Sequence, residues 1–196
     1  EGMSRAPFVL PRPDESLPRR MDMHASTVGW RMVNEKFPAH WVRSLGDCAE
    51  SSADEYGIGR DEQDEWALRS HQRAHAAWQD GLHSDYVMRV GELQLDESIR
   101  PDTSAQALAA LPPAYTSYGT VTAGNSAPLN DGAVAMLVGT REAGESLGLR
   151  PFGRVVTSAV VATEPDRFAI APVEAINRAV ARACRTLAEG GLVELH

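Results

Sequence analysis

Residues 118–138, YGTVTAGNSAPLNDGAVAMLV, limit what this chain can fold into more than any other segment. Three glycines and two asparagines lie among small side chains, and residues 133–138 are then apolar at every position. Glycine and asparagine favour turns, and an apolar run of this length favours a strand covered on both faces. The segment therefore predicts a loop followed by a buried strand. Asp131 is its only charged side chain, and it holds no Ser-His, Cys-His or metal-ligand grouping.

Length and charge narrow the class of protein. A chain of 196 residues can form one large domain or parts of two. Its net charge of −8 argues against a nucleic-acid surface, which would favour a basic face. No apolar run approaches the roughly 20 residues of a membrane span, and the N-terminus lacks the features of a signal peptide. A cytoplasmic protein is expected, and the initial Glu and the abrupt final ELH indicate cuts at both ends.

Hydrophobic spacing predicts where helices and strands lie. Helical spacing occurs in residues 41–56, 60–81, 104–111, 141–148 and 172–189, and residues 152–162 are typical of a second buried strand. In the second helix, the acidic first turn suits the positive end of the helix dipole and Gly81 suits the exit. Helices come first and strand–helix alternation begins only after residue 118, which predicts an α/β core in the later part.

Few side chains outside the loop suggest chemistry. Cys48 and Cys184 are interpreted as buried free thiols in a reducing compartment. His71 and His75 have one possible metal-ligand spacing on a helix, but no third ligand follows, so a helix face is favoured and no metal site is expected. The acidic group at residues 61–65 begins a helix, where carboxylates stabilise without catalysing.

Arg100 stands in a polar turn beside a proline, where a guanidinium can be offered to a phosphate. A surface arginine paired with Asp96 or Glu97 is the equally weighted alternative. Asn125, together with the Asn130–Asp131 pair, is typical of a tight structural turn. None of these signals names a reaction.

Several separated segments together resemble one family. GTVTAGNSAPLNDGAVAML is similar to the thiolase signature, in which a GTVTAGN loop leads into NDGAAA and a core strand. EGMSRAP resembles the family's ESMSRAP, and IGRDEQDEWALRSHQRA its loop-domain helix. DESIRPDT with LPPAY precedes the signature, and FAIAPVEAI occupies the place of GIGPVPA. The motifs occur in the family's order over almost the whole chain.

The resemblance implies an α/β fold, specifically part of the five-layered thiolase-like fold with an inserted, mostly helical loop domain. Residues 1–10 would end an N-terminal core segment, and residues 11–129 would form the coenzyme A-binding loop domain. Residues 130–150 would return to the N-terminal core, and residues 151–196 would begin the C-terminal core half.

The resemblance also implies an acyltransferase that moves acyl groups between 3-ketoacyl-CoA or acetyl-CoA and coenzyme A in fatty-acid or related lipid degradation. Coenzyme A would be a co-substrate, with no permanently bound cofactor, and the intact parent would be a homo-oligomer. Neither Cys48 nor Cys184 matches a catalytic cysteine of the family, so the chain alone is expected to be inactive. The alternatives are a non-catalytic thiolase-like protein that binds acyl-CoA or lipid, and a truncated interaction fragment.

The family's binding positions transfer residue by residue. Arg100 matches an arginine that reaches the nucleotide end of coenzyme A, and Tyr115 an aromatic position beside the ligand. The remaining matched positions are Ser44 and Leu45 near the acyl and pantetheine path, Ala123 where backbone meets pantetheine, Ala127 where serine is common, and His196 at an oxyanion-hole position. At residue 127, loss of one neutral hydrogen bond would weaken binding by about 0.5–1.5 kcal/mol.

Overall fold

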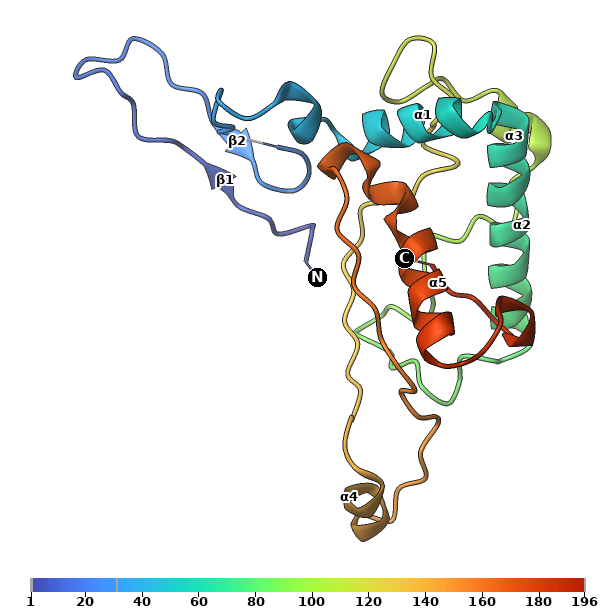
Figure 1. Cartoon of the computed structure of the whole chain (residues 1–196). Helices are drawn as coiled ribbons and strands as arrows, with labels where there is room; N and C mark the ends of the chain where they lie inside the picture. The colour runs from blue at the N-terminus through green and yellow to red at the C-terminus, as the bar shows by residue number, and fades with distance from the viewer. Residues whose placement is uncertain (1, 31, 196) are drawn as a thin grey trace. The chain divides into compact units, whose positions relative to one another are not determined.

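The computed structural model describes residues 2–30 and 32–195, and it divides the chain into two units. The central unit is Arg43–Leu129, and the flanking unit combines Glu1–Val42 with Asn130–His196. Each unit is described by itself. Figure 1 shows α1, α2 and α3 in the central unit and β1, β2, α4 and α5 in the flanking unit.

Helices of the central unit begin and end at capping residues that the sequence supplies. α1 (Leu45–Tyr56) is capped by the Ser44 side chain and ends at Gly57, whose left-handed φ of 66° suits glycine. The predicted helix from residue 41 therefore starts later, because Trp41 lies in a separate 3-10 turn, η1 (Ala39–Val42), of the flanking unit.

α2 and α3 form the other side of the central unit. α2 (Arg60–Gln79) has the predicted acidic first turn, and its exit passes through Gly81 with a left-handed φ of 69°. α3 (Ala105–Ala109) is capped by Ser104 and packs against α2. The predicted helices at 60–81 and 104–111 are confirmed, each with shorter limits.

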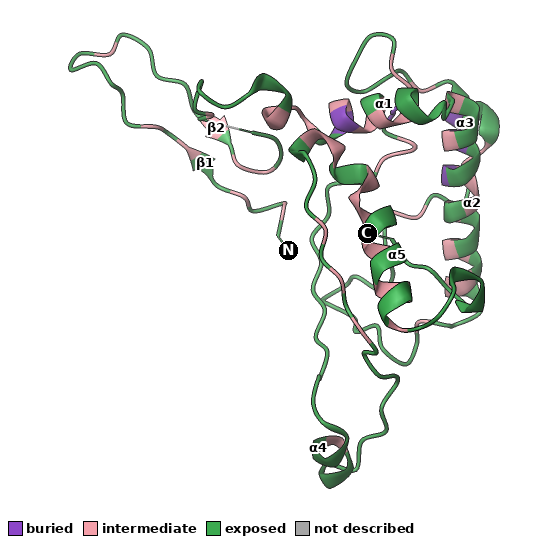
Figure 2. Cartoon of the chain, viewed as in Figure 1, coloured by how far each residue is buried: buried purple, intermediate pink, exposed green. Residues whose placement is uncertain are grey.

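All buried side chains of the described residues lie in this unit (Figure 2). The buried apolar residues come from α1, α2, α3 and the signature loop: Cys48, Ala67, Leu108 and Val121. Asp64 and Thr122 are buried beside them. The loop is therefore part of the core of the central unit.

The flanking unit has short elements joined by long irregular segments. β1 (Phe8–Val9) pairs antiparallel with β2 (His24–Ala25), with Phe8 opposite Ala25. α4 (Arg141–Ser146) is capped by Thr140 and followed by Gly148 at a φ of 68°, as predicted for a short helix there. The 3-10 turn η2 (Pro165–Ile170) packs against η1 and leads into α5 (Ala171–Arg182).

The two predicted buried strands are wrong in this structure. Residues 133–138 and 152–162 carry no strand, and most of their side chains are exposed, with Val134 at 92% and Leu137 at 86%. A strand needs a hydrogen-bonding neighbour and a covering layer, and within the described residues neither segment has a paired strand. Figure 1 shows them as the irregular segments that lead to α4 and return toward α5.

The last predicted helix and the second cysteine also differ from expectation. α5 stops at Arg182 because Cys184 adopts a left-handed φ of 52°, and Leu187 lies in a separate turn, η3 (Leu187–Glu189). Cys48 is a buried free thiol, as predicted. Cys184 is free but exposed, since it follows the helix end instead of lying on its apolar face.

Candidate functional site

Six predicted binding residues lie in the central unit: Ser44, Leu45, Arg100, Tyr115, Ala123 and Ala127. Two of them form the start of α1. The Ser44 hydroxyl accepts a hydrogen bond from the Asp47 N–H at 3.1 Å and donates one to Asp47 Oδ2 at 2.6 Å. Leu45, the first residue of the helix, is 66% exposed. An exposed apolar side chain therefore stands beside a capped helix end.

Tyr115 contacts this helix end through a glycine. A Cβ atom added to Gly46 would lie 2.3 Å from each of three ring atoms of Tyr115. Only a residue without a side chain allows the ring to lie this close to the helix. Tyr115 is consequently held at the start of α1, and it stays 47% exposed.

A carboxylate of α1 holds the beginning of the signature loop. The Thr120 N–H donates to Glu50 Oε2 at 2.9 Å, and the Val121 N–H donates to Glu50 Oε1 at 2.9 Å. The Thr120 hydroxyl donates to Oε2 at 3.0 Å. Burial alone would raise the pKa of Glu50, but these three donors stabilise the charged form and lower the pKa below its ordinary value. Gly119 lies so close to Glu50 that an added Cβ would overlap the carboxylate.

Asn125 fixes the rest of the loop. Its Oδ1 accepts from the Thr122 N–H at 2.7 Å, and its Nδ2 donates to the Thr120 carbonyl and to Asp64 Oδ1, both at 3.0 Å. Asp64 Oδ2 in turn accepts from Arg60 Nε at 2.7 Å. The predicted role of Asn125 in fixing a turn is confirmed, and the turn is anchored to a buried ion pair of α2.

The same ion pair joins the loop to α3. Arg60 Nη2 donates to the backbone carbonyls of Leu108 and Leu111, the second at 3.1 Å. The Leu108 and Leu111 side chains lie against Gly124, where an added Cβ would come within 2.6 Å of both. Ala123, between the buried Thr122 and Gly124, is exposed, and so is Ala127. The loop thus presents small side chains outward from a fixed backbone.

Arg100 lies in an exposed turn of the central unit. Its Nη1 donates to the Glu97 carbonyl at 2.6 Å, and its backbone N–H donates to His71 Nδ1 at 3.2 Å. Among the described residues its guanidinium makes no ion pair, so the alternative of pairing with the Asp96 or Glu97 carboxylate is not seen. No described hydrogen bond joins Arg100 to the loop or to Tyr115.

The other sequence candidates have structural roles. His71 accepts the Arg100 N–H, and no described group of three His, Cys, Asp or Glu side chains could hold a metal ion. In the flanking unit, the Ser4 hydroxyl and N–H donate to Asp131, the latter at 2.9 Å, and these bonds lower the Asp131 pKa. His196 lies outside the described residues.

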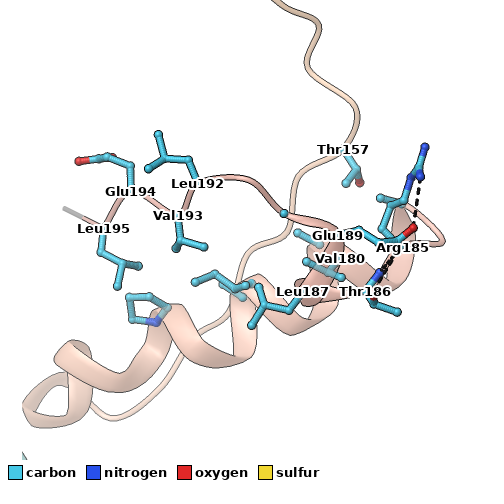
Figure 3. A pocket seen from close by; sticks show the side chains of 16 residues that line it. Thr157, Val180, Arg185, Thr186, Leu187, Glu189, Leu192, Val193, Glu194 and Leu195 are labelled. Atoms are coloured by element: carbon cyan, nitrogen blue, oxygen red, sulfur yellow. Dashed lines mark hydrogen bonds and ion pairs between the residues drawn. The ribbon is translucent and has the colours of Figure 1, made fainter.

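A hollow of about 680 Å³ in the flanking unit holds none of the predicted site residues that the structure describes. Figure 3 shows it between α5, here with Val180, and the segment bearing Leu192, Val193 and Leu195. Polar groups in its lining bond one another: Glu189 accepts hydrogen bonds from Thr186 and Arg185. It is an apolar surface of the helix and not the candidate site.

Comparison with known proteins decides the family. The sequence profile of the thiolase N-terminal domain matches residues 1–142. A beta-ketoadipyl-CoA thiolase of Escherichia coli is 33% identical over 206 residues, covering 100% of this chain and 51% of the relative. A 3-ketoacyl-CoA thiolase of Bacillus subtilis is 38% identical over 179 residues, covering 83% of this chain and 46% of the relative. The chain belongs to the thiolase family.

The fold of this thiolase chain agrees with that assignment. It matches the crystal structure of the Bacillus anthracis acetyl-CoA acetyltransferase with a TM-score of 0.84 and 29% identity, over 98% of this chain and 50% of that one. The fold is therefore thiolase-like, and the chain spans about half the length of the curated relatives it matches. Among the described residues, no helix combines the length and hydropathy of a membrane span.

The structure of the thiolase chain adds residues that the sequence interpretation missed. In the sequence, Glu50 and Gly46 are ordinary helix positions, and Asp64 belongs to the acids that stabilise a helix start. Their contacts are distant in sequence. Tyr115, against Gly46, and Thr120 and Val121, bonded to Glu50, lie 69 to 71 positions away, and Asn125 lies 61 positions from Asp64. The available signal was a spacing of four residues between Gly46 and Glu50, which places both on one face of α1.

Proposed function

We propose that this chain belongs to an acyltransferase that cleaves a 3-ketoacyl-CoA with coenzyme A, or forms one in the reverse reaction. Its central unit would provide part of the surface for coenzyme A. The observation that carries the proposal is the joint fixation of Tyr115 on Gly46 and of the signature loop on Glu50 and Asp64. A rigid backbone with small outward side chains and an exposed aromatic ring suits a narrow pantetheine arm.

Arg100 would bind the nucleotide end of that ligand. Its Nη1 is engaged with backbone carbonyls, but its Nε and Nη2 make no hydrogen bond among the described residues. These two N–H groups can form a paired contact with phosphate oxygens, an arrangement for which guanidinium is suited. Ser44 and Leu45 would border the pantetheine path, while Ala123 and Ala127 would offer backbone to it.

The finer statements are part of the same proposal. The parent protein would act in fatty-acid or related lipid degradation in the cytoplasm, as a homo-oligomer and without a permanently bound cofactor. Its chain would be divided at residues 10, 129 and 150 within a five-layered fold that carries the helical loop domain as an insertion. His196 would hold an oxyanion-hole position.

The 196 residues alone would show no thiolysis. Cys48 is 3% exposed inside α1, so its sulfur is not accessible to a thioester. Cys184 is accessible but lies at a helix end among the residues of the flanking unit, and it matches no acyl-carrying position of the family. The nucleophile would be supplied by other parts of the intact protein.

The test is an assay of acetoacetyl-CoA and coenzyme A with the full gene product and with the 196-residue chain. Loss of the enolate absorbance with the full product alone is expected. Clear turnover by the short chain would contradict its proposed inactivity. Binding of coenzyme A by the full product without turnover would favour the non-catalytic acyl-CoA-binding alternative.

A further inference from the structure

The Glu50 side chain reaches from the middle of α1 to the first residues of the signature loop. Both carboxylate oxygens are used, each by one backbone N–H of the adjacent residues Thr120 and Val121 at 2.9 Å. The Thr120 hydroxyl adds a third donor at 3.0 Å. A carboxylate suits two consecutive amides because it offers two charged acceptor oxygens at a fixed separation.

The loop has little regular pairing of its own. It forms one isolated bridge, Pro113 opposite Thr122, with the Ala114 N–H donating to the Val121 carbonyl at 2.9 Å. Asn125, Glu50 and Gln63 make further contacts with it, and Gln63 Nε2 donates to the Thr120 hydroxyl oxygen at 2.8 Å. The course of residues 119–121 is therefore set by a side chain of α1 to a large extent, and Ala123 follows two residues later.

We propose that Glu50 is a positioning residue for coenzyme A: it sets the backbone of residues 119–121 and thereby places Ala123 against the pantetheine arm. The inference rests on the proposed function of the central unit. Glu50 itself would not touch the ligand, because both of its oxygens already accept hydrogen bonds from the loop.

The first experiment needs no ligand. Glu50→Gln in the full gene product keeps the shape of the side chain but replaces one acceptor by an NH₂ donor that faces a backbone donor. Amide hydrogen exchange at Thr120 and Val121 should become about 10-fold faster or more, the loss expected for a charge-assisted bond. Asp54→Asn, which removes one charge from the exposed side of the same helix, should leave these two amides unchanged. Equal exchange in Glu50→Gln and wild type would overturn the inference.

The second experiment measures coenzyme A binding by calorimetry and the steady-state constants of the same proteins. Glu50→Gln should raise the Kd and KM for coenzyme A about 5- to 20-fold, with kcat changed less than 3-fold, because ground-state placement is lost. Cys48→Ala controls for general destabilisation, since it removes a buried side chain of α1 without touching the loop bonds. A Kd raised equally by Cys48→Ala would overturn the positioning role.

A milder variant protects the test against a folding failure. Thr120→Val removes the hydroxyl bond to Glu50 and the bond that this hydroxyl accepts from Gln63 Nε2 at 2.8 Å, but it leaves both backbone bonds to Glu50. It should move exchange and Kd in the same direction by about 2- to 3-fold. No shift in either quantity would contradict the inference. If wild type and Glu50→Gln bind coenzyme A with the same Kd, the inference is overturned but the proposed function is not. If wild type binds no coenzyme A, the proposed function itself is overturned.

Discussion

Asn125 donates a hydrogen bond of 3.0 Å to Asp64, a carboxylate 61 residues earlier that is itself paired with Arg60. Asp64 is 6% exposed, so its charge depends on these two partners for stabilisation inside the protein. The signature loop is thus fixed through a buried ion pair of α2, and its asparagine has a structural task.

Asn125→Ala should lower the free energy of unfolding by about 2–4 kcal/mol, because it leaves the Thr122 N–H and one Asp64 oxygen without their partner. Urea denaturation of the full gene product measures the change. Asp61→Asn, an exposed acid in the first turn of α2, is the matched control and should change stability by less than about 0.5 kcal/mol. Equal effects of the two substitutions would contradict the assigned network.

Gly46→Ala should displace the Tyr115 ring, because the new Cβ would lie 2.3 Å from it. Overpacking of this kind costs about 1–3 kcal/mol, and thermal denaturation would detect it. Gly59→Ser is the control, since a Cβ there meets nothing within 4 Å and serine also caps α2. The double variant Gly46→Ala, Tyr115→Ala should be less destabilised than the sum of the single changes, and strict additivity would rule out the clash.

Arg100→Ala in the full gene product should raise the KM for coenzyme A substrates about 10-fold with little change in kcat, since only binding of the nucleotide end is lost. Steady-state thiolysis at varied coenzyme A gives both constants. Arg73→Ala, an exposed arginine of α2, should leave the KM unchanged. A KM that is unaffected by Arg100→Ala would remove Arg100 from the site.

Acidification should release the loop through Glu50. The folded-state pKa of Glu50 lies below its ordinary value of 4.5, so its contribution to stability is present above pH 4.5 and is lost as the pH falls through the lowered pKa. Unfolding free energies of wild type and Glu50→Gln should therefore converge as the pH falls below 4.5. A difference that stays constant over this range would show that the Glu50 charge is not what holds the loop.

Local signals predicted much of the central unit. Gly57 and Gly81 mark helix ends, and Asp61 and Glu62 open α2, because each acts through its own few neighbours. Asn125 is predictable as a turn residue for the same reason, since it bonds the nearby Thr120 and Thr122. Sequence could not reveal that Glu50 reaches Thr120, since a contact across 70 residues depends on how the whole unit packs.

The two predicted strands are absent from the described residues for a related reason, because strand formation also depends on distant segments. The apolar pattern of residues 133–138 describes what the segment would bury, yet a ladder also requires a partner, and the described residues provide none. Cys184 has the sequence spacing of a helix residue but lies outside the helix. Its backbone is left-handed, and α5 ends two residues before it, at Arg182. The ligand-binding roles of the predicted site residues stay predictions.

The placement of Gly46 and Glu50 on one face of α1 makes that helix sensitive to phase. Successive residues of an α-helix are rotated by about 100°, so one residue inserted between them would turn Glu50 away from the loop while Tyr115 kept its place on Gly46. A deletion would have the converse effect. The spacing of three residues between Gly46 and Glu50 therefore has to be kept. Insertions or deletions in this segment should be tolerated far less than substitutions.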